Sequence, residues 1–193
     1  MSRAQALPRR AWSVLRRFKK DRRGSFLVEL AFTLPVLLVI TIGSFDTGRY
    51  VLLHQKMNRA ASTMADLVSR PSSISTSQID LMFSAAEELL QPFDLTNSGH
   101  VIVSSVSKAA GDAPTVDWQH TGGGSLSATS AIGSAGGAPT LPSGFTLRDG
   151  ENLIVAEVFF NYEPYFLDFV LEPTVISHVA IRRPRRGDLS TLN

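Results

Sequence analysis

The sequence predicts an α+β fold with a long N-terminal helix, a second short helix and a small antiparallel sheet of about four strands. Three observations carry this prediction. Residues 25–45 are an unbroken apolar run, and apolar positions then recur at steps of three and four up to residue 70. The C-terminal half instead contains short β-branched segments that alternate with a period of two. A helix therefore precedes a domain that mixes helix and sheet.

Charge divides the chain into two parts of opposite sign. Residues 1–24 hold nine of the 19 Lys and Arg residues and one acid, a net charge of +8. The other ten basic and 16 acidic residues give the remainder a net charge of −6. A basic segment alone is typical of nucleic-acid binding. Here it precedes an apolar helix, which favours a basic cytoplasmic leader beside a membrane, with the C-terminal domain on the far, periplasmic side.

Residues 25–45 have the length and composition of a transmembrane helix. They contain one charged residue, Glu29. As a helix they span about 31 Å, close to the hydrocarbon thickness of a bilayer. A core helix of this length would carry a polar stripe, which is missing here. A cleaved secretory signal would have a shorter apolar core and a small-x-small site after it, and Arg16-Arg17-Phe18 only loosely resembles a twin-arginine signal.

The helix is expected to continue through residues 46–70 as an amphipathic segment. Pro71 ends it, because the residue before a proline avoids the helical region. Pro35 is expected to kink it, and Gly43 and Gly48 to loosen it. The expected apolar face consists of Leu53, Met57, Ala60, Ala61, Met64, Leu67 and Val68.

Residues 71–193 are predicted to form the exported α+β domain. A second helix begins with Ser77-Gln-Ile-Asp80, which resembles a capping box, and ends before Pro92. Its expected apolar face is Ile79, Met82, Phe83, Ala86, Leu89 and Leu90. Strands are expected at residues 101–106, 115–120, 153–162 and 174–181.

The strand at residues 153–162 gives the clearest alternation. Ile154, Ala156, Val158, Phe160 and Tyr162 share one face, and Glu157 and Asn161 lie on the other. The Gly/Ser-rich segment 121–144 is interpreted as a flexible surface loop. It lacks the Gly-Lys-Ser/Thr ending of a phosphate-binding loop, so no nucleotide site is expected there.

No pattern of catalytic residues stands out. The absence of Cys excludes a disulfide framework and a Cys-based metal site. The four His lack metal-ligand spacing, and His54 is expected to be solvated. Asp117, Asp149 and Glu151 lie beside expected turns, where acids solvate loops. We therefore expect no enzymatic activity, no cofactor, no metal and no small-molecule substrate.

Glu29 is the residue that a simple membrane anchor does not explain. A carboxylate in a spanning helix costs about 2.5–3.5 kcal/mol on insertion scales. Glu29 lies close to the basic end of the expected helix, so its side chain could extend to bring the carboxylate to the membrane interface. If the chain were cut between Gly24 and Ser25, the new amine would lie four residues before Glu29 on the same helix face. In an assembly, the amine of one subunit could equally meet Glu29 of the next.

The residues around Glu29 resemble those of a known family. The segment Arg22-Arg23-Gly24-Ser25-Phe26-Leu27-Val28-Glu29 looks like a prepilin signal, with Gly before the cut and Glu at the fifth mature position. The run that follows, Leu30-Ala31-Phe32-Thr33-Leu34-Pro35-Val36-Leu37-Leu38, resembles the TadE-like pseudopilins of bacterial tight-adherence (Tad/Flp) pilus systems. Two later segments also resemble that family, Phe160-Asn-Tyr-Glu-Pro-Tyr165 and Val179-Ala-Ile-Arg-Arg-Pro-Arg185.

This chain departs from the family's pattern in four ways, one of which is the absence of the Cys pair that some relatives carry. Leu30 stands where the family usually has Phe, the leader is long, and the chain is larger than a major Flp pilin. A minor subunit is therefore the better fit.

The resemblance implies that a prepilin peptidase of the inner membrane cuts after Gly24. The mature protein would then join other pilins and pseudopilins of the Tad machinery and contribute to an adhesive pilus. Arg182, Arg183, Arg185 and Arg186 are candidates for contact with acidic partners or lipid head groups, and a solvated tail is the simpler interpretation.

Two alternatives stay open. One is a signal-anchored envelope protein with a ligand-binding or hydrolytic periplasmic domain. The other is a pseudopilin of a general secretion system. The sequence does not decide whether the protein lies in the fibre, at its tip or only in the inner membrane.

Overall fold

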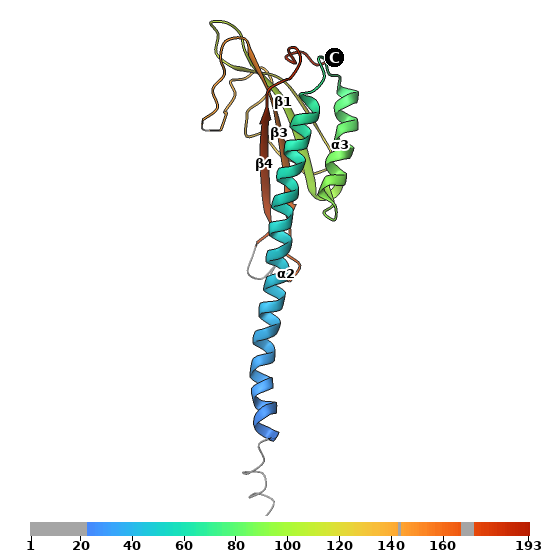
Figure 1. Ribbon diagram of the computed structural model, residues 1–193, viewed down its shortest axis with the longest axis vertical. Coiled ribbons are helices and arrows are strands. Elements are labelled where there is room, and N and C mark those ends of the chain that lie inside the picture. Colours follow the sequence, from blue (N-terminus) through green and yellow to red (C-terminus); the bar gives the residue numbers. More distant parts are fainter. Residues whose placement is uncertain (1–22, 143, 167–171) are drawn as a thin grey trace, which may run out of the picture. The chain divides into compact units, whose positions relative to one another are not determined.

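The computed structural model describes residues 23–142, 144–166 and 172–193 (Figure 1). The basic leader, apart from its last two residues, lies outside this part of the chain. The chain divides into two units, with the boundary between Phe45 and Asp46. The fold is α+β, as predicted: a long N-terminal helix, further helices and one antiparallel sheet.

Three helices occur among the described residues. Helix α2 is Arg23–Val68 and contains Pro35, α3 is Thr76–Leu90, and α4 is Leu95–Ser98. The sequence predicted α2 and α3 but not the short α4.

The capping box of α3 differs from the prediction by two residues. The N-cap is Ser75, whose hydroxyl accepts the Gln78 amide, while the Gln78 side chain accepts the Ser75 amide. Glutamine at the third helical position completes this pair of bonds, so the helix begins before Ser77.

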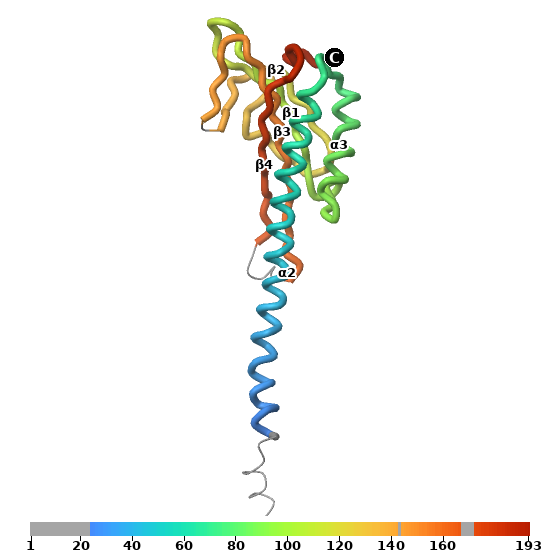
Figure 2. The backbone as a smooth tube through the Cα atoms, in the orientation of Figure 1, coloured from blue at the N-terminus to red at the C-terminus, as the bar shows by residue number. Residues whose placement is uncertain are grey.

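The sheet contains four strands in the order β2-β1-β3-β4, and every neighbouring pair is antiparallel. Figure 2 traces its backbone. The strands are β1 Gly99–Lys108, β2 Thr115–Gly122, β3 Glu151–Tyr162 and β4 Thr174–Arg182. All four predicted strands are confirmed, each somewhat longer than expected.

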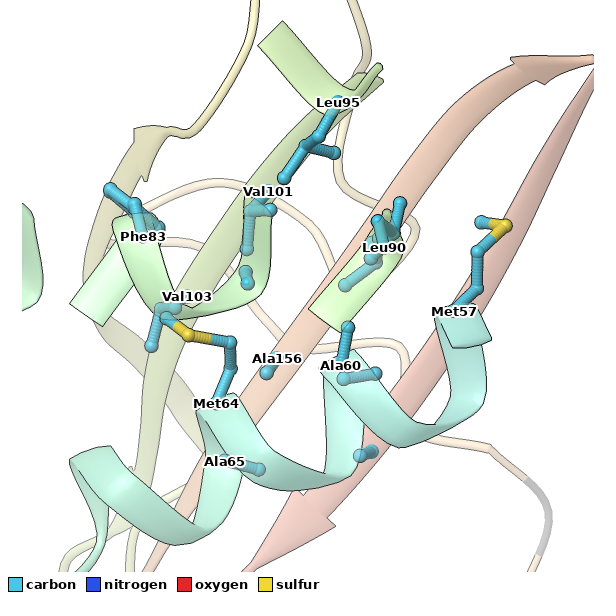
Figure 3. Close-up of a cluster of buried hydrophobic side chains, with 14 of the residues drawn as sticks. Met57, Ala60, Met64, Ala65, Phe83, Leu90, Leu95, Val101, Val103 and Ala156 are labelled. Atoms are coloured by element: carbon cyan, nitrogen blue, oxygen red, sulfur yellow. The ribbon is translucent and has the colours of Figure 1, made fainter. Parts of the chain in front are cut away.

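One face of the sheet packs against α3 and the C-terminal half of α2. Figure 3 shows Met64 beside Val103 and Phe83, with Ala156 behind them on β3. The predicted alternation of β3 is confirmed, because its even-numbered apolar residues from Ile154 to Tyr162 all join this core. The contribution of α2 consists of Leu53, Met57, Ala60, Ala61, Met64, Ala65 and Val68.

The opposite face of the sheet is covered by the long connection between β2 and β3. Ile132 of this connection is buried, and it joins the second core cluster of Val106, Val116, Leu147, Leu153 and Val155. The backbone of Val116 also exchanges hydrogen bonds with Gly136 and Gly137. The Gly/Ser-rich segment therefore packs on the sheet as a second layer, which its composition did not indicate.

Candidate functional site

The first candidate site is the apolar surface of residues 24–45. Most large apolar side chains from Phe26 to Ile40 are exposed, and the most apolar stretch has no buried residue. Among the described residues, one helix is long and apolar enough to cross a membrane. Apart from Glu29, the apolar surface has no charged side chain between residues 25 and 45.

The hydroxyl groups of Thr33, Thr41 and Ser44 are satisfied within the helix. Thr33 Oγ1 donates to the carbonyl of Glu29 at 2.7 Å, and Thr41 Oγ1 donates to that of Leu37 at 2.8 Å. Ser44 makes the same type of bond to Ile40 at 2.7 Å. Apolar surroundings tolerate a hydroxyl only when its bond is made internally, so these contacts fit a lipid environment.

Gly24, Ser25 and Glu29 all lie in the first turns of α2 and are exposed. A Cβ added at Gly24 would meet no atom within 4 Å, so packing does not require glycine there. Ser25 and Glu29 are one helical turn apart, which is the geometry that their proposed pairing needs.

The second candidate site is a clamp around Asp46, the first residue of the C-terminal unit. Its side chain is buried, and its two oxygens accept the amides of Tyr165 at 3.2 Å and Phe166 at 3.0 Å. Tyr162 donates its hydroxyl to the Asp46 carbonyl at 3.1 Å. Burial, and then the nearby Asp46 charge, raise the pKa of Tyr162. One aspartate therefore fixes residues 160–166, the aromatic-Pro segment, to α2.

Arg49 lies one turn after Asp46 and stacks on aromatic rings. Its guanidinium carbon is 3.6 Å from the ring centre of Tyr165 and 5.6 Å from that of Phe93. Contacts of this kind hold a cation by the negative face of the ring. Arg49 therefore adds a second connection between α2 and the aromatic-Pro segment.

His54 is half-buried, and the expectation that it is solvated is wrong. Its Nδ1 lies 2.9 Å from Nε2 of His178 on β4, and its ring packs edge-on against Tyr50. Burial, and then the nearby His54, lower the pKa of His178. The two histidines connect α2 to the edge of the sheet.

Glu157 is fully buried beneath the Gly/Ser-rich connection. Ser130 donates its hydroxyl to one carboxyl oxygen, and the amide of Ala131 donates to the other at 2.9 Å. Burial raises the pKa of Glu157, an effect that these bonds oppose. The glutamate thus anchors the connection to the sheet.

Asp117 also differs from its expected place in a solvated turn. It lies on β2 and accepts hydroxyl donations from Ser105 at 2.9 Å and Ser107 at 2.6 Å. Burial raises its pKa, which the two bonds oppose. Its role is therefore within the sheet.

Two of the four C-terminal arginines have carboxylate partners inside the chain. Arg183 lies 3.3 Å from Glu151, and Arg185 lies 2.7 Å from Asp66. Arg182 donates to the carbonyl of Ile181, and Arg186 is exposed. Within the described part of the chain, no group of three or more His, Asp or Glu residues is placed to hold a metal ion.

One feature of the sequence points to Asp46. Asp46 is the first charged residue after Glu29, and it directly follows the apolar run. Its contacts lie 119 and 120 residues away, so no local pattern reveals them.

An exposed apolar helix near the N-terminus is compatible with a single-pass membrane anchor. Residues 24–66 match the model of a family described as TadE-like protein. The match confirms the resemblance at the N-terminal motif and covers both Glu29 and the Asp46 side of the clamp. No curated protein and no solved structure matches the chain.

Proposed function

We propose that this protein is a TadE-like minor pseudopilin that contributes to the biogenesis or assembly of an adhesive Tad/Flp pilus. The observation that carries the proposal is the family match, which begins at Gly24 and continues through the apolar surface. In this proposal the protein is a non-enzymatic subunit of the inner membrane, with its N-terminus cytoplasmic and its C-terminal domain periplasmic.

The proposed maturation step is a cut by prepilin peptidase between Gly24 and Ser25. It removes the basic leader and creates an amine one turn before Glu29. Two charges of opposite sign in an apolar environment strongly favour pairing, within one subunit or between neighbours. The mature helix could then leave lipid for a helical assembly, with the apolar surface covered in both states.

Maturation is tested by mass spectrometry of the protein isolated from membrane and pilus fractions. We expect an N-terminus at Ser25 in cells with active prepilin peptidase, and an intact leader in the Gly24→Leu variant. Gly43→Leu is the matched control, because both glycines are on α2 and neither has an atom within 4 Å of an added Cβ. An intact leader in the unmodified protein would support the signal-anchored envelope protein instead.

Assembly is tested by Glu29→Ala. We expect processing to continue, because the cut site is unchanged, and piliation to fall severalfold, because the new amine has lost its carboxylate. Thr33→Ala is the control, since Thr33 lies one turn further on the same helix and bonds only backbone carbonyls. Normal piliation of Glu29→Ala cells, counted by electron microscopy, would contradict the pairing.

The C-terminal arginines have a smaller place in this proposal. Arg183 and Arg185 have partners in the domain, whereas Arg182 and Arg186 have no carboxylate partner among the described residues. These two are the better candidates for contact with acidic partners or lipid head groups.

A further inference from the structure

A pocket beside Arg49 contains a donor without an acceptor. The pocket has a volume of about 200 Å³, and its walls include Arg49, Phe93, Asp94, Glu163 and Tyr165. Arg49 Nη1 is buried and makes no hydrogen bond to any described residue. A buried donor that has lost water and gained no partner is costly, and native structures rarely keep one without a reason. The pocket therefore lacks an acceptor that a ligand could supply.

The charges around the pocket restrict the ligand. Arg49 would attract an anion, and its planar guanidinium suits the oxygens of a phosphate. Asp94 and Glu163 line the same pocket, so a purely anionic ligand would also meet two carboxylates. The faces of Phe93 and Tyr165 already hold the Arg49 guanidinium, so a cationic part of the ligand would be attracted by the two carboxylates. A group that carries a phosphate and an ammonium a few bonds apart satisfies both sides.

The position of the pocket in the chain indicates where such a group comes from. Arg49 is the first basic residue after the apolar surface, only four residues beyond residue 45. Tyr50, Tyr165 and Phe166, at or next to the pocket, are all exposed, and Tyr165 is 66% exposed. Exposed aromatic side chains at the end of an apolar span are typical of the membrane–water interface, where they lie at head-group level.

We propose that this pocket binds the head group of a zwitterionic aminophospholipid. Arg49 donates to the phosphate, and the carboxylates of Asp94 and Glu163 face the ammonium. The inference rests on the membrane anchoring in the proposed function but not on the pilus role. A bound head group holds the domain at a fixed depth on the bilayer, and it must be released before the subunit leaves the membrane.

The experiment uses the full-length protein purified in a mild detergent. Native mass spectrometry measures binding of phosphatidylethanolamine and of phosphatidylglycerol at equal concentrations. We expect phosphatidylethanolamine to bind more tightly, and Arg49→Gln to weaken it by about tenfold, because the phosphate loses its charged donor. Arg59→Gln is the matched control, since Arg59 is an exposed arginine ten residues further along α2.

Two further variants keep the result interpretable. Arg49→Lys retains the charge but not the planar fork, so we expect a fold intact by Trp118 fluorescence and lipid binding still severalfold weaker. Glu163→Gln should reduce the preference for phosphatidylethanolamine over phosphatidylglycerol. Equal binding of both lipids by the unmodified protein, or equal binding by Arg49→Gln and Arg59→Gln, would overturn the proposal.

Other sources of the same chemistry give different results. Soluble glycerophosphoethanolamine should not displace the lipid at equal concentration, and displacement would indicate a site for a free phosphodiester. If Arg49→Gln abolishes piliation without changing lipid binding, Arg49 contacts a protein partner and the lipid proposal is wrong. A mature N-terminus at Ser25 in these same cells shows that the proposed function stands even when lipid binding fails.

Discussion

The two halves of α2 share one secondary structure and have opposite surroundings. Leu38 in the N-terminal half is 52% exposed, whereas Leu53 in the C-terminal half is fully buried. Both are leucines in the same helix, so the difference does not come from residue type. It comes from the spacing of the apolar residues around each.

The C-terminal half has apolar residues on one face, and the sheet of the same chain covers that face. The N-terminal half is apolar on every side, and one sheet cannot cover a helix all round. Such a surface is compatible with cover by lipid or by other helices. The comparison separates two roles of apolar residues in one helix, stabilising the domain and contacting the surroundings.

The largest expected effect is the difference in stability between variants of two leucines of α2, Leu53 and Leu38. Leu53→Ala should lower the free energy of unfolding by about 2–5 kcal/mol, because it leaves a cavity in a closed core. Leu38→Ala should change it by less than about 0.5 kcal/mol, because the site is exposed. Urea unfolding of the full chain in detergent, followed by the fluorescence of buried Trp118, measures both. Equal destabilisation by the two variants would show that the N-terminal half also belongs to the domain core.

Asp46 lies at the border between the two halves of α2, and a variant at this position tests how the border is stabilised. Asp46→Asn replaces one of two carboxyl acceptors by an amide group that faces a backbone N–H. We expect a loss of about 1–3 kcal/mol in unfolding free energy, because a buried donor is left without a partner. The amides of Tyr165 and Phe166 should also exchange their hydrogens faster, which hydrogen-exchange mass spectrometry detects.

The control variant is at Asp66, near the C-terminal end of α2. Asp66→Asn removes ion pairs with Arg70 and Arg185 that lie near the surface. Such pairs contribute about 0–1 kcal/mol, so this variant should be milder. If Asp66→Asn is the more damaging of the two, the clamp is not what fixes the aromatic-Pro segment.

The sequence predicted those parts of the fold that repeat locally. The alternation from Ile154 to Tyr162 places β3 and its two faces, because a strand has a fixed period. The steps of three and four from Leu53 to Val68 identify the buried face of α2 for the same reason. The N-terminal motif at Gly24 and Glu29 is local too, and it carried the family resemblance.

The remaining features depend on residues far apart in the chain. His54 and His178 are 124 residues apart, and either one alone looks like a surface histidine. Ile132 lies among glycines and serines, so its burial shows only when the connection is seen folded over the sheet. The pairing of Asp46 with the aromatic-Pro segment likewise needs the sheet to bring the two together. Local composition predicts only the average exposure of the residues in a segment. These residues are more buried than their neighbours in the sequence suggest.

The smallest expected effect concerns the histidine pair that joins the covered half of α2 to β4. The pKa of His178 is lowered from its ordinary value of 6.5, so the folded protein resists a proton that the unfolded chain accepts. Stability from this group is therefore complete above pH 6.5 and is lost as the pH falls below it. One group contributes at most about 1.4 kcal/mol per pH unit over this window.

His178→Gln tests this effect, because its amide can replace Nε2 beside His54 and does not titrate. We expect the fall in unfolding free energy between pH 7 and pH 5 to become shallower. His100→Gln is the control variant, since His100 is also part-buried and its Nδ1 lies 3.4 Å from the Gly124 carbonyl rather than beside another histidine. An identical pH dependence for both variants would assign the acid sensitivity to other groups. The histidine pair would then not be what makes the contact between α2 and the sheet depend on pH.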